Sequence, residues 1–385
     1  MSFKRNLISM LSGNFGKIFV QTLFFFLFAK LLGVEDFGIY SAVFALVSVA
    51  APFSGLGYGN ILIKEKSEKD NSINLNFSNA AFVLKLCAIF LSAFLVVITY
   101  FIFGNVVSIY FVILLCINEL FFQRYLELMG QCYIAIERMQ HTATIFITSS
   151  LTRLIPLSAL PFVENKLITW VYIYSILLFL VTLIFRIRLK SVIVKSKHSN
   201  KKIKNDLKES IYFSIGLSSQ NIYNDIDKTI LGKLGTFEFV GLYSMAYKIV
   251  DVTFFPAKAV LGTTYPKFFK LGSYGGRATL KLTSILALSL FIYSIIASII
   301  ILISKPLILF VLGDSYNSLY NILPFLLLIP ILRSLHYPVA DAITGMGHQK
   351  VRSFIQIGIA IFNLVISVIL IRLDQRLVVL SSLVS

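Results

Sequence analysis

The sequence predicts an all-α integral membrane protein with about 11–12 transmembrane helices, in two parallel six-helix repeats around a central cavity. Apolar residues make up 57% of the chain and charged residues only 14%, whereas a soluble domain usually carries about 25% charged residues. The apolar residues gather in runs of roughly 20, the length that a helix needs to cross the hydrocarbon core. This pattern excludes an ordinary soluble enzyme, a disordered chain and an outer-membrane barrel of alternating strands.

The long apolar runs define the predicted spans. These are 14–32, 38–63, 77–103, 107–129, 142–162, 167–185, 210–232, 239–264, 282–303, 317–343 and 353–371. The final segment, 377–385, is too short to cross a bilayer, and we expect it to begin a twelfth span. The opening segment has a basic start but no short apolar core followed by a cleavage site, so it is predicted to be the first permanent span.

Basic residues are unevenly distributed over the predicted loops. With the N-terminus in the cytoplasm, roughly four Lys or Arg residues lie on the cytoplasmic side for each one outside, as the positive-inside rule requires. We therefore expect a multi-pass protein of the cytoplasmic (inner) cell membrane. The net charge of +17 is interpreted as loops facing anionic membrane lipids rather than as a nucleic-acid surface.

The longest polar segment, 186–208, divides the predicted spans. We expect an N-terminal lobe at 1–190 with spans 1–6, a basic cytoplasmic linker at 191–208, and a C-terminal lobe at 209–385. The C-terminal lobe contains spans 7–11 and the truncated span 12. A nucleic-acid arm is the less favoured interpretation of the basic segment.

Two short matches indicate an internal repeat. GIYSAVFALV (38–47) aligns with GLYSMAYKIV (241–250) at an offset of 203 residues, and AIERMQH (135–141) aligns with AITGMGH (342–348) at 207. Because each repeat contains six spans, both repeats run the same way through the membrane. Parallel repeats with a site between the halves are an architecture of transporters.

Ionisable residues inside spans are the candidates for function, since each costs about 2.5–3.5 kcal/mol at a helix centre. The predicted substrate-binding residues of the cavity are Lys17, Arg124, Arg153, Lys248, Lys258 and Arg333. A cationic interior suits an anionic ligand such as a diphosphate, which Arg binds through two oxygens at once. Arg153 and Arg333 lie deepest and are placed ahead of Arg124. The alternatives are internal salt bridges and, for Lys17, snorkelling to the interface.

Two carboxylates are candidates for proton or sodium coupling. Glu119 is the deepest acidic residue of the first half, and Asp251 shares one face of span 8 with Lys248 and Lys258. The alternative is that each carboxylate simply neutralises a nearby Lys or Arg. The carrier interpretation requires that the buried cations are not all cancelled by carboxylates in a solid core.

Other motifs carry less weight. Asp225 and Asp227 have the spacing of a metal-binding DxD, but two residues apart on a helix point to opposite sides. The three cysteines support neither a disulfide framework nor a zinc site, and the glycine-rich segments lack nucleotide-binding spacing. The sequence therefore predicts no catalytic residues, no metal and no cofactor.

Three segments, 31–47, 227–251 and 341–370, resemble the polysaccharide (O-antigen type) flippases. That family belongs to a superfamily with the multidrug-and-toxin exporters and the lipid II flippase. The resemblance implies alternating access and export of undecaprenyl-diphosphate-linked oligosaccharide for O-antigen or capsular polysaccharide synthesis. The implied partners are this lipid-linked oligosaccharide, membrane lipids and the polysaccharide polymerase machinery. Relatives have twelve to fourteen full spans, whereas this chain stops inside the twelfth.

Two other functions stay open. A multidrug or small-solute exporter of the same superfamily would bind mostly cationic drugs, which a basic interior opposes. A membrane glycan polymerase or glycosyltransferase is expected to need a large outer domain, and the predicted loops leave no room for one.

Overall fold

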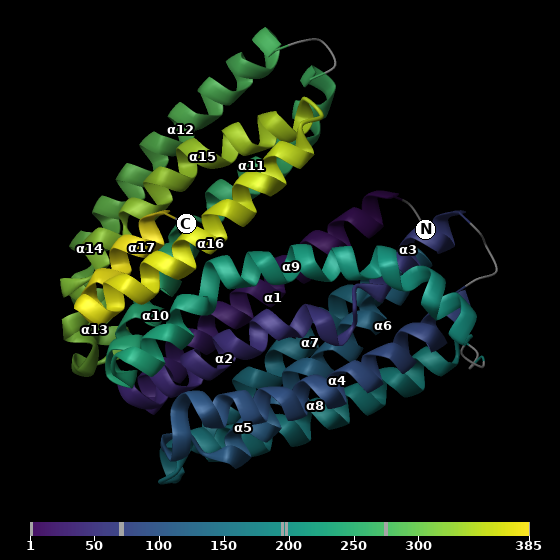
Figure 1. The fold of residues 1–385 in the computed structure, drawn as a ribbon, viewed down its shortest axis with the longest axis horizontal. Coiled ribbons are helices and arrows are strands. Elements are labelled where there is room, and N and C mark those ends of the chain that lie inside the picture. The colour runs from purple at the N-terminus through teal and green to yellow at the C-terminus, as the bar shows by residue number, and fades with distance from the viewer. Residues whose placement is uncertain (1–2, 69–72, 194–195, 197–198, 273–275, 385) are drawn as a thin grey trace. The chain divides into compact units, whose positions relative to one another are not determined.

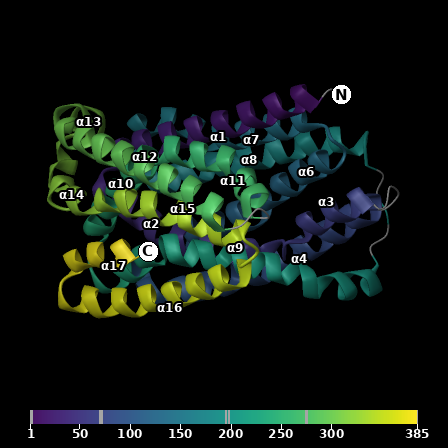
Figure 2. The same cartoon turned by 90° about the horizontal axis from the view of Figure 1, so that it is seen from above.

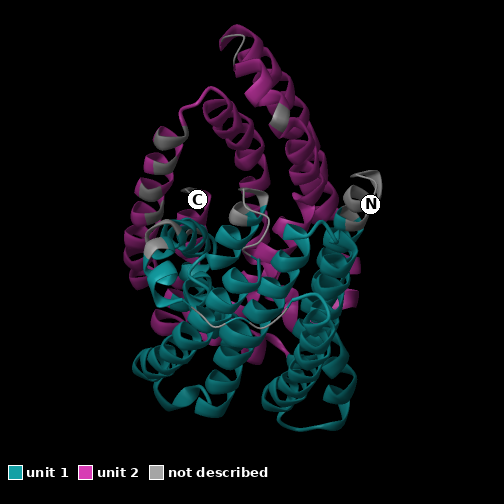
Figure 3. Cartoon of the chain, turned by 90° about the vertical axis from the view of Figure 1, so that its right-hand side faces the viewer, with its two compact units in different colours: residues 1–32, 39–229 teal, residues 33–38, 230–385 magenta. Residues whose placement is uncertain are grey.

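The computed structural model describes residues 3–68, 73–193, 196, 199–272 and 276–384. These residues form helices and turns, with no β-strand among them (Figure 1). They fall into two compact units, one of residues 1–32 with 39–229 and one of residues 33–38 with 230–385 (Figure 3). Each unit is a bundle of helices with its own buried core.

The first unit is built from the N-terminal helices. They are α1 (Phe3–Leu32), α2 (Val34–Ser54), α3 (Tyr58–Glu68), α4 (Ile73–Phe103), η1 (Gly104–Val106), α5 (Ile109–Cys116), η2 (Ile117–Phe122), α6 (Gln123–Ala135), α7 (Met139–Leu154), η3 (Ile155–Phe162), α8 (Lys166–Lys190) and α9 (Asn200–Leu234). Helices α1 and α7 lie side by side (Figures 1 and 2). Aromatic rings fill the space between α1, α2 and α8, where Phe24, Phe28 and Tyr40 pack around the buried Trp170.

Two irregularities shape the helices of this unit. The span of α5 and α6 contains the π-helical segment η2, a feature found often at functional sites. The span of α2 and α3 breaks after Pro52, where Leu56 and Gly57 adopt positive φ angles of 43° and 65°. Gly57 also faces α9 closely, because a Cβ there would lie 2.4 Å from the Ser210 carbonyl oxygen.

Helix α9 packs against α2 through polar side chains. Ser214 donates to the Pro52 carbonyl at 2.9 Å, and Thr229 donates to the Ala42 carbonyl at 2.9 Å. These bonds explain why the first unit extends to Thr229. The unit boundary thus falls inside α9, after Thr229. The sequence instead places the lobe boundary at 191–208, part of which lies outside the described residues. The lobes at 1–190 and 209–385 stay predictions.

The second unit contains the C-terminal helices. They are α10 (Phe237–Thr253), α11 (Phe255–Gly272), α12 (Gly276–Ile303), α13 (Lys305–Leu312), η4 (Asp314–Asn321), α14 (Leu323–Leu326), α15 (Leu328–Gly345), α16 (Gln349–Leu373), η5 (Gln375–Leu377) and α17 (Val378–Val384). Helix α15 packs against both α11 and α12 (Figures 1 and 2). Tyr337 of α15 packs against the cluster of Phe254 and Leu290, and Ala342 of α15 belongs to the cluster of Phe268 and Leu286.

Within the described residues, nine helices are long and apolar enough to cross a membrane. They correspond to nine of the predicted spans. The predicted spans 210–232 and 239–264 fall short of the same criteria of length and composition. The first lies in the polar helix α9, and the second is divided between α10 and α11.

The internal repeat is visible in the backbone of two turns. The first turn contains hydrogen bonds from Ile136 N to Cys132 O, from Glu137 N to Ile134 O and from Arg138 N to Tyr133 O. The second contains bonds from Met346 N to Ala342 O, from Gly347 N to Thr344 O and from His348 N to Ile343 O. All three bonds recur at an offset of 210 residues. The predicted offset of 207 paired the correct turns but was wrong by three residues, because it followed shared letters rather than backbone geometry.

The other predicted match keeps its offset of 203 and marks a close helix contact. A Cβ on Gly38 would lie 1.8 Å from the Phe237 carbonyl oxygen, and one on Gly241 would lie 2.0 Å from that of Val34. The two contacts are reciprocal, because an offset of 203 relates Gly38 to Gly241 and Val34 to Phe237. The first turn of α2 belongs to the second unit, which includes residues 33–38, and there it lies close to the first turn of α10. Both glycines are required by this close approach.

Candidate functional site

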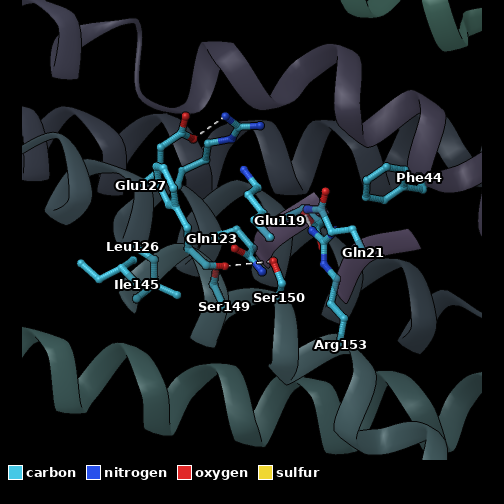
Figure 4. Close-up of a pocket in the computed structure, with 13 residues that line it drawn as sticks. Gln21, Phe44, Glu119, Gln123, Leu126, Glu127, Ile145, Ser149, Ser150 and Arg153 are labelled. Carbon is cyan, nitrogen blue, oxygen red and sulfur yellow. Dashed lines mark hydrogen bonds and ion pairs between the residues drawn. The ribbon is translucent and has the colours of Figure 1, made fainter. Parts of the chain in front are cut away.

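The first unit contains a partly open cavity of about 210 Å³ between α1, α2, η2, α6 and α7 (Figure 4). Its lining residues are Lys17, Gln21, Phe44, Glu119, Gln123, Arg124, Leu126, Glu127, Ile145, Phe146, Ser149, Ser150 and Arg153. Four of the residues predicted from the sequence, Lys17, Arg124, Arg153 and Glu119, thus line one cavity. In Figure 4, Glu127 and Arg153 lie toward opposite sides of the lined space.

Arg153 is held by a buried network. Its guanidinium donates to Glu119 Oε2 at 2.6 Å and to the Tyr174 hydroxyl at 3.2 Å. The Tyr174 hydroxyl donates to Glu119 Oε1 at 2.9 Å and accepts from Gln123 at 3.0 Å. The Arg153 and Glu119 side chains are only 11% and 9% exposed.

This network changes the expectation for Arg153. Removing one member of a buried ion pair typically costs 3–5 kcal/mol because the remaining charge is left uncompensated. A ligand that drew Arg153 away from Glu119 would leave the buried Glu119 carboxylate without a compensating charge. Arg153 therefore forms the internal salt bridge that was the alternative to substrate binding. It is a weaker candidate for binding a substrate phosphate than its depth in the membrane suggested.

The other two cations of the cavity are less restrained. Arg124 donates to Glu127 Oε2 at 2.6 Å, and these side chains are 30% and 45% exposed. Lys17 is half-buried, with its ammonium 4.9 Å from the centre of the Phe146 ring. Among the described residues, no carboxylate forms an ion pair with Lys17.

The charge on the cavity wall is positive overall. Three cations, Lys17, Arg124 and Arg153, face two carboxylates, Glu119 and Glu127. Each arginine has a carboxylate partner, so the excess charge belongs to Lys17. The hydroxyls of Ser149 and Ser150 and the amides of Gln21 and Gln123 supply further polar groups to the same cavity.

The second unit contains a similar cluster on α10, α11 and α15. Arg333 donates to Asp251 Oδ1 at 2.9 Å and to the Tyr247 hydroxyl at 2.6 Å. Lys258 approaches the same carboxylate oxygen at 3.8 Å. Lys248 lies one turn before Asp251 on α10 and is half-buried. Arg333 is thus committed to a carboxylate and a tyrosine, as Arg153 is.

The structure also brings in residues that the sequence did not single out. The Tyr174 hydroxyl joins Arg153 to Glu119 by hydrogen bonds. The Tyr247 hydroxyl accepts a hydrogen bond from Arg333, and the centre of the Tyr247 ring lies 5.5 Å from the Arg333 guanidinium carbon. The sequence could have indicated these residues, because a tyrosine in the middle of a span has a buried hydroxyl that needs a hydrogen-bond partner. Asp225 forms an ion pair with Lys228, and no cluster of metal ligands occurs in the described part of the chain.

An all-helical bundle with membrane-length apolar helices and paired charges around an internal cavity defines a multi-pass membrane protein of the transporter-fold class. The chain belongs to the polysaccharide biosynthesis protein family, whose model matches residues 3–271. A search of curated protein sequences gives no significant match. The predicted relationship to the polysaccharide flippases is thereby confirmed at the level of the family.

Solved structures share the fold at low sequence identity. An inward-facing MATE family multidrug resistance transporter of the MOP superfamily aligns with a TM-score of 0.78 and 12% identity, over 95% of this chain and 90% of that one. The lipid II flippase MurJ, in an inward closed conformation, aligns with a TM-score of 0.76 and 13% identity, over 98% and 84%. A MOP superfamily transporter from Pyrococcus furiosus gives 0.59 and 11%, over 98% and 91%. These likenesses confirm the predicted all-α membrane fold.

Proposed function

We propose that the protein is a flippase that moves an undecaprenyl-diphosphate-linked oligosaccharide across the cytoplasmic (inner) membrane for O-antigen or capsular polysaccharide synthesis. The family is one of polysaccharide biosynthesis, and the fold is that of MATE-type transporters and of the lipid II flippase. In this proposal the N-terminus is cytoplasmic, the protein works by alternating access, and it delivers its product to the polymerase machinery. It performs transport and no chemical catalysis.

The observation that carries the proposal is the excess positive charge at Lys17. A diphosphate in the cavity of the first unit would meet Lys17 and Arg124 as cations, with serine hydroxyls and glutamine amides beside them. Hydrogen bonds to charged groups are worth about 1.5–3 kcal/mol each. The lipid tail needs no protein pocket, because it stays in the bilayer.

The acidic residues have a proposed role in coupling. Protonation or sodium binding at Glu119 would weaken its hold on Arg153, and the same event at Asp251 would free Arg333 and Lys258. The deep arginines would then be available to substrate in only one state of the carrier. Transport unaffected by Glu119→Gln or Asp251→Asn would exclude that residue from coupling.

The test of the function uses purified protein in detergent, titrated with inorganic pyrophosphate, and protein in vesicles with a fluorescent lipid-linked sugar diphosphate. We expect Lys17→Gln to weaken pyrophosphate binding about tenfold, equivalent to about 1.4 kcal/mol, and to slow translocation. Lys85→Gln is the matched control, because Lys85 is an exposed lysine of the same unit outside the cavity. Equal effects of the two substitutions, or tighter binding of organic cations than of pyrophosphate, would favour a solute exporter.

A further inference from the structure

Two arginine–carboxylate pairs border the cavity of the first unit, and they are built differently. Arg153 and Glu119 are almost fully buried and share the Tyr174 hydroxyl. Arg124 and Glu127 are 30% and 45% exposed, and among the described residues each is the other's only polar side-chain partner. The first pair is fixed by its surroundings, whereas the second is held by a single contact.

Arg124 has unused hydrogen-bonding capacity. Its Nε atom is buried and has no acceptor, although its terminal nitrogen reaches Glu127. Buried donors without acceptors are uncommon in folded proteins and point to a missing partner. A guanidinium has five donors in a planar fork, and phosphate oxygens match that fork through two parallel bonds.

Arg124 and Glu127 also lie where two cavities meet. Both line the 210 Å³ cavity and a second cavity of about 50 Å³ beside the α2–α3 break, with Gly57, Tyr58 and Gln131. A Glu127 side chain released from Arg124 would keep access to open space. Its displaced carboxylate would thus be solvated, whereas a displaced Glu119 would be stranded in the core.

We propose that Glu127 is an internal competitor for Arg124: it occupies the guanidinium in the empty site and gives way to a phosphate oxygen of the ligand. The inference rests on the proposed function and adds a residue that lowers the affinity of the site. A carrier must release what it binds, and a built-in carboxylate that returns to Arg124 assists that release. Glu127 is a positioning residue for Arg124 and does not itself contact the ligand.

The expected effect follows from the exposure of the pair. Ion pairs this exposed are generally weak, so their displacement costs little. We expect Glu127→Gln to tighten binding of inorganic pyrophosphate about two- to fivefold, the equivalent of about 0.4–1 kcal/mol. Glu127→Ala should give a similar gain. Glu164→Gln removes the same charge from an exposed loop of this unit and should leave the affinity unchanged.

A double-mutant cycle separates competition from a general change of charge. If Glu127 acts by occupying Arg124, Glu127→Gln has no effect in an Arg124→Gln background, and it keeps its effect in a Lys17→Gln background. Emission from Trp170, the single tryptophan, checks that each variant keeps its packed core.

The outcomes distinguish this inference from the function on which it rests. Tighter binding by Glu127→Gln that disappears without Arg124 supports the competitor. No tightening, or a gain that persists without Arg124, overturns it while the diphosphate site stands. Pyrophosphate binding that does not depend on Lys17 contradicts the proposed function, and the competitor is rejected with it.

Discussion

Replacing Arg153 with methionine would leave Glu119 as an uncompensated charge inside the first unit. The two groups are 2.6 Å apart, and their side chains are 11% and 9% exposed. Breaking such a pair costs about 3–5 kcal/mol, whereas replacing both members with apolar residues often costs little. We therefore expect Arg153→Met to lower the free energy of unfolding by about 3–5 kcal/mol, and the double variant Arg153→Met/Glu119→Leu to lower it substantially less.

Unfolding of the detergent-solubilised protein can be followed by the fluorescence of Trp170. Its indole nitrogen donates to the Arg153 carbonyl at 3.1 Å, so the probe lies at the altered site. Arg124→Met is the control, because its partly exposed pair should contribute less than about 1 kcal/mol. The reasoning is refuted if the double variant is as unstable as Arg153→Met, or if Arg124→Met is equally damaging.

Two further predictions concern packing and the tyrosine hydroxyl. Gly38→Ala and Gly241→Ala should each lower the thermal stability of the purified protein, because the added Cβ meets a backbone carbonyl. Gly262→Ala, where a Cβ meets nothing within 4 Å, should be neutral or stabilising by up to about 1 kcal/mol. Equal melting temperatures for all three would contradict the reciprocal contact. Tyr174→Phe should cost about 1–3 kcal/mol in the same unfolding assay, because Glu119 loses a donor in a buried site; an unchanged free energy of unfolding would show that the hydroxyl is dispensable.

Composition and run length were sufficient to predict the fold class. Long apolar helices are required wherever the chain crosses a bilayer, because backbone polar groups find no partners in lipid. The helix ends were less predictable where a helix breaks. The predicted span 239–264 is interrupted at Phe254, between α10 and α11, since Pro256 lacks the N–H that a continuous helix would use.

The charged residues of the site could be predicted from their depth within the spans, but the residues with which they form ion pairs could not. Lys17, Arg124, Arg153 and Glu119 were all identified as charges inside spans, and they line one cavity. The π-helical segment η2 changes the rotation of the residues that follow it, so a regular helical wheel does not place Glu119 relative to Arg124. Likewise, the alternative interpretation of Asp251 paired it with a lysine of its own span. Lys258 does approach it at 3.8 Å, but Arg333 of α15 is closer, at 2.9 Å.

The internal repeat does not have one constant offset along the chain. Corresponding residues are 203 apart at Gly38 and 210 apart at the turn after Ala135. Seven more residues therefore separate Gly241 from the turn after Gly345 than separate Gly38 from the turn after Ala135. Within this longer stretch, η4 and α14 line a cavity of about 590 Å³ with residues such as Ser318, Asn321 and Phe325. The two turns thus keep the same backbone hydrogen bonds, although the segments that precede them differ in length.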